Sequence, residues 1–277
     1  MTATLGCRTG SASDPGLVRD NNEDRVYTDE AAGVFLVVDG MGGRAAGEMA
    51  AQTATEVIPR YLNENEPDVA GAITAANNEI YRLGQQHEEW QGMACVLTLV
   101  LVRDEQITVG HVGDSRLYLV WNGTIRKLTS DHSLVGELED GGELTEAQAM
   151  AHPKRNEVFR DVGSRPREAT DAEFIEIRSF PFRPSAALLL CTDGLSDMLT
   201  AEEINTVIQR YCGDPSAVAR ELVEAANCAG GKDNISVILV TGPEFLGDAR
   251  HAITQVREIR SWWRRMLNRV VRLIDRH

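Results

Sequence analysis

The chain has 277 residues, of which 43% are hydrophobic, and it carries a net charge of −14. This length and hydrophobic content predict a compact body with its own core. The negative charge argues against nucleic acid as the main partner, because phosphate backbones are bound through basic patches. Five cysteines without a CxxC pair, and apolar runs well short of the ~20 residues of a membrane span, predict a cytoplasmic protein.

The hydrophobic pattern along the chain separates blocks of strands from pairs of helices. Strands are expected at 25–28, 34–38, 96–103, 106–112, 116–121, 124–128, 171–178, 187–191 and 235–240, and helices at 47–63, 68–89, 201–211 and 215–228. The links at 104–105 and 122–123 are two residues long, which requires antiparallel pairing of the strands they join. Paired helices without βαβ alternation predict an α+β protein, in which antiparallel sheets carry helices on their outer faces.

The segment 131–152 differs from its surroundings. It is polar, has few β-branched residues and contains Gly136, Gly141 and Gly142. We expect a mobile segment with one short helix at 145–151, where Thr145 and Gln148 fit a capping box.

Four acidic residues lie at the ends of apolar strands. Asp39, Asp114 and Asp193 each come directly after a strand, and Asp233 comes just before one. Turn chemistry explains any one of them, and Asp114 could instead pair with Arg116. Together they predict strand ends that converge, where crowded carboxylates repel one another unless a cation lies among them. Oxygen ligands of this kind suit magnesium or manganese, so the pattern indicates a metal-dependent enzyme.

A charged cluster at 19–24 precedes the first predicted strand and mixes Arg19 with Asp20, Glu23 and Asp24. The guanidinium of Arg19 could clamp a phosphate group with two hydrogen bonds. A solvated surface cluster explains the same residues equally well.

Taken in chain order, these motifs resemble those of the metal-dependent serine/threonine protein phosphatases of the PPM (type 2C) family, in its bacterial branch. The matching stretches are 19–24, 38–43, 113–116, 131–133, 152–153 with 156, 192–194 and 233–234. The resemblance implies a four-layer α-β-β-α sandwich of two antiparallel sheets flanked by helix pairs. It also implies a dinuclear manganese or magnesium centre at one end, between the sheets.

The resemblance further implies the metal ligands. Asp39 would bridge both metal ions, the carbonyl of Gly40 would bind one of them, and Asp193 and Asp233 would hold the other. Asp114 would lie near an additional, third metal ion of the kind found in bacterial relatives.

Other matching residues would act around this centre. Arg19 would grip the substrate phosphate and, with Asp39, form the catalytic pair. Glu23, Asp24 and Asn234 would act mainly through metal-bound water. A flap beside the site would contain Asp131, His132, Ser133 and His152.

The expected reaction is hydrolysis of phosphoserine and phosphothreonine in proteins by metal-activated water. The implied partners are a bacterial serine/threonine kinase and its substrates, and we expect the phosphatase to be a monomer. Two alternatives stay open: a phosphoprotein-binding pseudophosphatase or sensor module, and a metallohydrolase of small phosphomonoesters. Loss of a metal acid would favour the first, and preference for sugar phosphates over phosphopeptides would favour the second.

The C-terminal residues differ in charge from the rest. We expect a phosphatase domain at 1–247 and a basic amphipathic helix at 248–277. Residues 249–277 hold eight arginines and two acids, a net charge of +6, which leaves −20 for the remaining chain. Apolar residues recur there at spacings of three and four, and Trp262 and Trp263 are adjacent. Such a helix could dock on the acidic body or contact a membrane surface or a partner.

Overall fold

The structure is a computed structural model that describes residues 6–64, 67–168, 170–171 and 173–248. Its strands are β1 (Arg8–Asp14), β2 (Arg25–Asp29), β3 (Val34–Met41), β4 (Ala94–Arg103), β5 (Gln106–Val112), β6 (Arg116–Trp121), β7 (Thr124–Lys127), β8 (Glu176–Pro181), β9 (Ala187–Cys191) and β10 (Ile235–Thr241). Its helices are α1 (Arg44–Glu64), α2 (Val69–Gln86), the 3-10 turn η1 (Glu88–Trp90), α3 (Leu134–Asp140), α4 (Glu146–Met150), α5 (Asp193–Ser196), α6 (Ala201–Ile208) and α7 (Pro215–Cys228).

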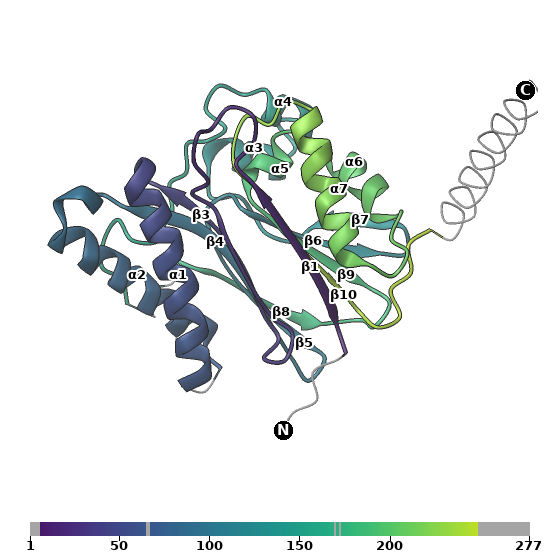
Figure 1. Ribbon diagram of the computed structural model, residues 1–277, viewed down its shortest axis with the longest axis horizontal. Helices are drawn as coiled ribbons and strands as arrows, with labels where there is room; N and C mark the ends of the chain where they lie inside the picture. The colour runs from purple at the N-terminus through teal and green to yellow at the C-terminus, as the bar shows by residue number, and fades with distance from the viewer. Residues whose placement is uncertain (1–5, 65–66, 169, 172, 249–277) are drawn as a thin grey trace, which may run out of the picture.

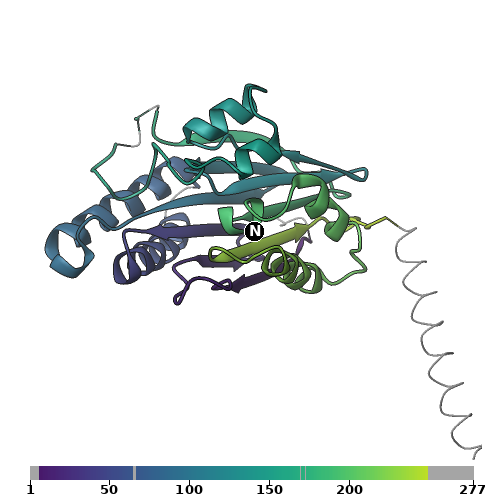
Figure 2. The same ribbon diagram turned by 90° about the horizontal axis from the view of Figure 1, so that it is seen from above.

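The strands form two five-stranded antiparallel sheets that lie face to face. The first sheet has the order β1-β10-β9-β6-β7 and the second has the order β2-β3-β4-β5-β8. In Figure 1, α1 and α2 cover the outer face of the second sheet, and α6 and α7 cover the outer face of the first. The view from above in Figure 2 shows the same layers from a second direction. The predicted α+β sandwich of four layers, α-β-β-α, is confirmed.

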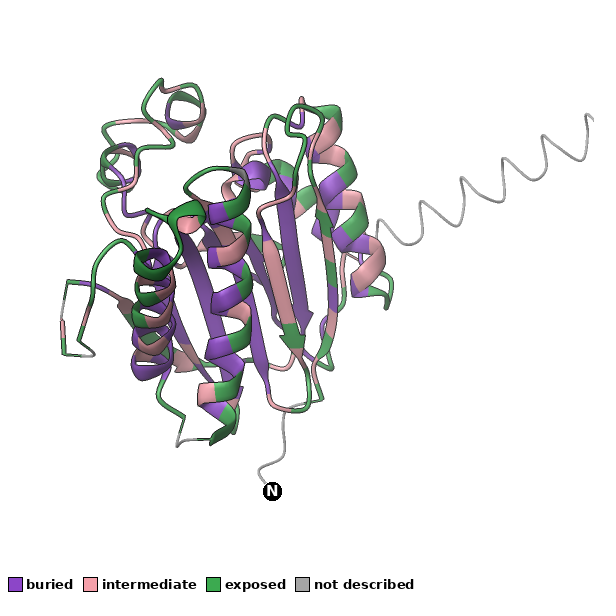
Figure 3. Cartoon of the chain, turned by 60° about the vertical axis from the view of Figure 1, so that its left-hand side comes forward, coloured by how far each residue is buried: buried purple, intermediate pink, exposed green. Residues whose placement is uncertain are grey.

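The central strands are buried on both faces, as their continuous apolar sequences require. In β3, Phe35 and Val37 pack against the other sheet, where they meet Leu188 and Ile238. The alternate residues of β3 pack instead against the helices outside. Figure 3 shows these strands as buried ribbons between helices whose outer faces are exposed.

Helices α2 and α7 begin where the sequence offers a cap. Asp68 accepts a hydrogen bond from the backbone N–H of Gly71 at the start of α2, and Asp214 caps α7, which has Pro215 in its first turn. No helix in the described part of the chain has both the length and the apolar character needed to cross a membrane.

Several elements differ from the prediction, among them β1, α3 and β8. Strand β1 was not expected, because Arg8–Asp14 is small and polar; it forms by pairing along β10, where the hydroxyls of Ser13 and Ser236 lie 2.8 Å apart. Helix α3 lies inside the segment expected to be mobile, and Ser133 caps it. The strand expected at 171–178 lies at Glu176–Pro181. The short helix with a capping box at Thr145 is confirmed.

The sheet registers bring distant segments to one end of the sandwich. In the second sheet Asp39 lies opposite Val96, beside the end of β5. In the first sheet Cys191 pairs with both Arg116 and Val237, so the start of β6, the end of β9 and the start of β10 lie side by side. The loops at this end carry the acidic residues of the predicted site.

Candidate metal centre

The four predicted acids meet in one cavity. Asp39, Asp114, Asp193 and Asp233 all line a space of about 220 Å³ at the end of the sandwich. They come from β3, the β5–β6 turn, the start of α5 and the loop before β10. Other lining residues include Arg19, Glu23, Gly40, Met41, Asn156 and Asn234. The predicted convergence of strand ends is therefore present in the structure.

Glycine allows the start of α1 to approach the end of β3 beside Asp39. A Cβ atom on Gly40 would lie 2.2 Å from the carbonyl oxygen of Gly47, and a Cβ atom on Gly47 would lie 2.0 Å from a carboxylate oxygen of Glu23. The backbone contact at Gly40 is far too short for any other residue, and a side chain at Gly47 would displace the Glu23 carboxylate. The two glycines therefore let the Glu23 carboxylate and the Gly40 backbone share one wall of the cavity.

Two carboxylate oxygens at this site are buried without a hydrogen-bond partner: Oδ1 of Asp193 and Oδ1 of Asp24. The other oxygen of Asp24 accepts a hydrogen bond from the Thr192 hydroxyl at 2.9 Å, and that hydroxyl accepts one from the backbone N–H of Ser236 at 3.0 Å. Buried polar atoms are nearly always paired. Unpaired carboxylate oxygens facing other carboxylates are the arrangement that a cation satisfies.

The charges of these groups agree with this interpretation of the donor set. Burial, followed by the nearby carboxylates of Asp24, Asp193, Asp114 and Asp233, raises the pKa of Asp39 well above its ordinary value. Burial also raises the pKa of Asp24 and of Asp114 to about 7. Without a counter-charge these groups favour protons. Hard oxygen donors crowded in this way fit divalent magnesium or manganese.

Arg19 is held at the rim of the cavity. Its Nη2 lies 2.7 Å from Oδ2 of Asp233, and its side chain is 54% exposed. Asn234 fixes the loop that carries Arg19: its Oδ1 accepts a hydrogen bond from the N–H of Glu23 at 2.8 Å, and its Nδ2 donates to the carbonyl of Asn21 at 2.8 Å. Arg19 and Glu23 of the cluster at 19–24 therefore lie in the cavity wall, so the cluster is not a detached surface patch.

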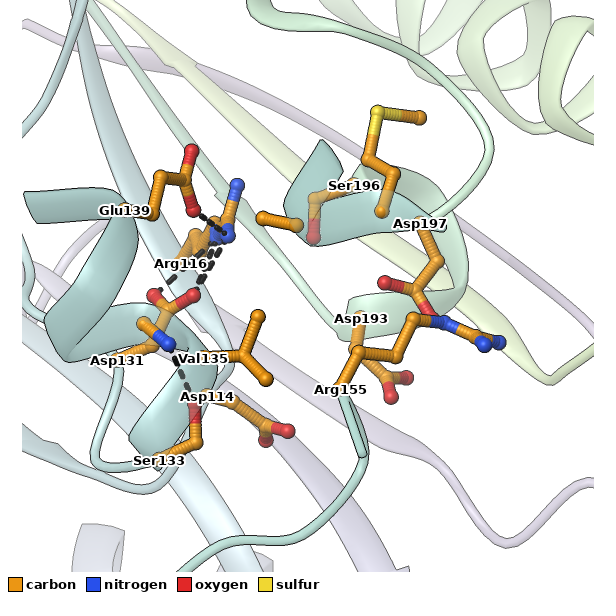
Figure 4. A pocket seen from close by; sticks show the side chains of 13 residues that line it. Asp114, Arg116, Asp131, Ser133, Val135, Glu139, Arg155, Asp193, Ser196 and Asp197 are labelled. Carbon is orange, nitrogen blue, oxygen red and sulfur yellow. Dashed lines mark hydrogen bonds and ion pairs between the residues drawn. The ribbon is translucent and has the colours of Figure 1, made fainter. Parts of the chain in front are cut away.

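A second, smaller cavity of about 20 Å³ shares Asp114 and Asp193 with the first and adds Asp197. Figure 4 shows these three carboxylates around it, with the ion pair between Arg155 and Asp197 at one side. The sequence analysis missed Arg155 and Asp197. The position of Asp197, four residues after Asp193 at a helix start, was the available signal, because such residues share a helix face.

Arg116 does not pair with Asp114 but with two other acids. Its Nη2 lies 2.6 Å from Asp131 and 2.8 Å from Glu139, and all three side chains are largely buried. The alternative in which Asp114 serves only as a partner of Arg116 is therefore wrong. Glu139 lies in α3, so this ion cluster fixes α3 beside the second cavity.

The four predicted flap residues do not form one group. Asp131, His132 and Ser133 are buried in the body, where Ser133 caps α3. His152 lies in the loop after α4, where its Nδ1 accepts a hydrogen bond from the N–H of Lys154 at 3.2 Å. His152 lines neither of the two cavities described above.

Comparisons with known proteins agree with this geometry. The model of the family described as protein phosphatase 2C matches residues 18–226. The serine/threonine protein phosphatase PstP of Mycobacterium tuberculosis is 34% identical over 242 residues, which are 85% of this chain and 45% of that protein. This chain thus spans about half the length of that relative.

Two further comparisons cover nearly the whole of the other chain. The serine/threonine phosphatase stp of Listeria innocua is 33% identical over 240 residues, which are 82% of this chain and 93% of that protein. A crystal structure of the catalytic domain of PstP in complex with two manganese ions superposes with a TM-score of 0.74 at 31% identity, covering 85% of this chain and 97% of that one.

Proposed function

The chain belongs to the protein phosphatase 2C family, and we propose that it hydrolyses phosphoserine and phosphothreonine in proteins. The observation that carries this proposal is the cavity in which four carboxylates from four strand ends face one another, with Arg19 at the rim. Phosphoryl transfer requires positioning and charge stabilisation above all, and these residues supply both.

The same residues would hold two manganese or magnesium ions. Asp39 lies between the two sheets and would bridge the ions, the Gly40 carbonyl would bind one, and Asp193 and Asp233 would bind the other. Asp114 would hold a third ion at the second cavity, which it shares with Asp193. Bound there, divalent cations would activate water and neutralise phosphate charge. The PstP structure with two manganese ions is the precedent for this assignment.

Arg19 would bind the phosphate group of the substrate. Its guanidinium is paired with Asp233 at 2.7 Å, and this bond raises the pKa of Arg19. A cation held by Asp233 would compete for the same carboxylate oxygen. The guanidinium would then be free to donate two parallel hydrogen bonds to phosphoryl oxygens. Asn234 keeps the loop of Arg19 in place during this exchange, because it is bonded to the backbone of Asn21 and Glu23.

The cavity favours a phosphorylated side chain over a charged metabolite. Among the lining residues whose side chains the structure describes, Arg19 is the cationic one. A sugar phosphate or nucleotide carries further polar groups that would find few partners there. An esterified serine or threonine presents only the phosphate, with its peptide outside the rim.

The decisive test is a comparison of kcat/KM for a phosphothreonine peptide and for glucose 6-phosphate, each with manganese and after chelation. We expect manganese-dependent turnover of the peptide at a rate far above that of the sugar phosphate. Faster turnover of the sugar phosphate would favour a small-molecule phosphatase. Tight binding of the peptide without turnover in saturating manganese would favour a phosphoprotein-binding module.

The partners and location follow from the proposed reaction. A phosphatase of this class needs a serine/threonine kinase to make its substrates, and we infer that a bacterial kinase and its targets are those partners. We also infer that it works in the cytoplasm as a monomer with its catalytic domain at 1–247. Its five cysteines are free thiols, two of them buried in strands, which suits a reducing compartment.

A further inference from the structure

His132 makes two hydrogen bonds to the residue that precedes the metal-site acid Asp114. The backbone N–H of His132 donates to the carbonyl of Gly113 at 2.7 Å. The N–H of Gly113 donates to Nδ1 of the His132 ring at 3.0 Å. Both polar backbone groups of Gly113 are therefore bonded to one residue, which is 6% exposed.

Gly113 needs such support because its backbone is unusual. Its φ angle is +106°, and a Cβ atom there would lie 2.2 Å from the side chain of Val96. This tight turn sets the direction in which Asp114 leaves β5. Glycine itself has wide conformational freedom, so the turn keeps its shape only where other residues hold it.

The hydrogen bond from Gly113 defines the state of the His132 ring. A backbone N–H can bond only to a nitrogen lone pair, so Nδ1 is unprotonated and the neutral ring carries its proton on Nε2. Nε2 lies 3.3 Å from Nη1 of Arg160 and 3.8 Å from a carboxylate oxygen of Glu176, and the shorter bond from the Gly113 N–H at 3.0 Å decides that Nδ1 is the acceptor. Burial lowers the pKa of His132 to about 3, which keeps the ring neutral.

His111, His132 and Glu176 lie close enough to suggest a separate metal site, with one ligand atom of each within 4.8 Å of the others. The hydrogen bonds argue against it. Nε2 of His111 faces the Ser130 carbonyl at 3.2 Å, so it carries a proton, and Nδ1 faces the Thr98 hydroxyl at 2.9 Å. Neither ring then has a free lone pair for a cation. The two rings lie 4.9 Å apart, and His111 supports His132 by packing.

His132 also holds the chain that follows α4. Its carbonyl accepts a hydrogen bond from the N–H of Phe159 at 2.9 Å, and the neighbouring Ser133 forms a β-bridge with Val158. Val158 lines the metal cavity together with Asp114. One residue thus connects the turn that carries Asp114 with another segment that lines the cavity.

We propose that His132 is a positioning residue of the metal centre. The lone pair of its Nδ1 and its backbone N–H fix the Gly113–Asp114 turn so that Asp114 faces the cavity, and its carbonyl fixes the Val158–Phe159 segment to the same turn. Its ring neither binds a metal ion nor touches the substrate. This inference rests on the proposed function only in calling the cavity a metal centre.

Two substitutions separate the acceptor at Nδ1 from the rest of the ring. In His132→Asn the side-chain oxygen stands where Nδ1 stands, so the bond from Gly113 is kept. In His132→Gln the oxygen lies one carbon further out, near the position of Nε2, so that bond is lost although size and polarity are similar. His87→Leu, at the far end of α2, is the control for loss of an imidazole.

Two measurements apply to these proteins. The first is hydrogen exchange of the Gly113 amide by NMR in the metal-free protein, without substrate. We expect the Gly113 amide to exchange at the same rate in the wild type, H132N and H87L. In H132Q we expect it to exchange about tenfold faster, because one buried hydrogen bond is lost. The second is manganese titration by calorimetry. We expect H132Q to weaken binding of the ion at Asp114 by about tenfold, while H132N stays near the wild type.

Three results would overturn the proposal. Gly113 exchange that is the same in the wild type and in H132Q would show that the bond does not hold the turn. Equal losses in H132N and H132Q would assign the effect to the ring as a packing group. Zinc binding by the wild type that Glu176→Gln abolishes would show that the cluster is a metal site. A wild type inactive on phosphopeptides would contradict the proposed function and leave the exchange result standing.

Discussion

Asp24 shows how strongly single residues at this site depend on a counter-charge. It is 2% exposed, one of its oxygens lacks a hydrogen-bond partner, and burial raises its pKa from 3.8 to about 7. In the metal-free protein the folded state therefore keeps a proton that the unfolded chain has lost above pH ~4. Because the folded state then binds more protons, the free energy of unfolding falls as the pH rises from about 4 to about 7.

This predicts a pH-dependent gain in stability for Asp24→Asn in the metal-free protein. The amide keeps an acceptor for the Thr192 hydroxyl but has no charge to bury. We expect the free energy of unfolding of the variant, relative to that of the wild type, to rise by up to ~1.4 kcal/mol for each pH unit between pH 5 and pH 7. Urea unfolding at several pH values in the presence of a chelator measures this difference. A constant difference across that range would contradict the raised pKa.

Asp39→Asn tests the proposed bridge between two metal ions. We expect turnover of phosphopeptide to be abolished, while the fold remains and the metal-free protein becomes more stable because repulsion among the carboxylates is reduced. Steady-state kinetics in saturating manganese and thermal unfolding after chelation measure the two effects. Asp104→Asn is the control, since Asp104 lies in an exposed turn at φ +49°, a conformation that asparagine tolerates. Wild-type rates in Asp39→Asn would exclude the bridging role.

Arg19→Ala tests recognition of the phosphate. Loss of a charge-assisted hydrogen bond worth ~1.5–3 kcal/mol predicts a KM for phosphopeptide raised about tenfold or more. Arg220→Ala is the matched control, because Arg220 is similarly exposed and lies on α7, outside the cavity. An unchanged KM in Arg19→Ala would leave Arg19 with only its ion pair to Asp233.

The sequence was enough to predict the residues that carry charge at strand ends but not those that support them. Asp39, Asp193 and Asp233 stand out because carboxylates follow apolar runs. The ion pair of Arg155 with Asp197 and the bonds of His132 to Gly113 join residues that are distant in sequence. Their partners depend on how loops cross in space, and local patterns carry no information about such contacts.

At the scale of elements, prediction succeeded where the sequence has a long apolar pattern. The long helices have an apolar stripe, and the central strands have continuous apolar runs. Strand β1 has neither, and its partner β10 lies more than 200 residues away in the sequence. Helix α3 is short and glycine-containing, and it is fixed by tertiary ion pairs from Arg116 to Glu139 and from Lys127 to Asp140. Short segments of this kind are helical only in their tertiary context.

Helix α4 should be the most easily perturbed element near the cavity. It has five residues, and its capping box between Thr145 and Gln148 satisfies two backbone N–H groups. Thr145→Ala should cost ~1 kcal/mol of local stability. If the segment 131–152 controls access, we expect an altered KM for phosphopeptide and unchanged hydrolysis of a small aryl phosphate. Thr200→Ala, which removes the capping box of α6, is the control. Equal losses on both substrates would assign α4 a purely structural role.

The arrangement of the whole molecule explains why one end of the sandwich carries the site. Antiparallel pairing within each sheet, and packing of the two sheets face to face, place the ends of β3, β5 and β9 and the start of β10 together. The order of strands in the sheets follows from long-range pairing, which periodicity does not reveal. The motif order along the chain pointed to the family and through it to this topology.

The C-terminal residues 249–277 lie outside the described part of the structure, and their role stays a prediction. Their charge of +6 contrasts with −20 for the rest of the chain, which permits docking on the acidic body. Two features favour a membrane surface. The adjacent Trp262 and Trp263 suit an interface, and anionic lipids attract arginine-rich helices in proportion to their charge.

We therefore predict that the full-length protein co-sediments with vesicles of phosphatidylglycerol and phosphatidylcholine, and that a protein truncated after Gly247 does not. Binding should weaken as salt rises from 50 to 500 mM, because screening reduces the attraction between arginines and lipid headgroups. A full-length protein with Trp262→Ser and Trp263→Ser should keep the charge but lose most of the binding, since the apolar face then has less to insert. The full-length and the truncated protein should hydrolyse an aryl phosphate at the same rate, because the proposed catalytic residues all precede Gly247. Negligible binding of the full-length protein, together with lower thermal stability of the truncated one, would show instead that the tail docks on the acidic body.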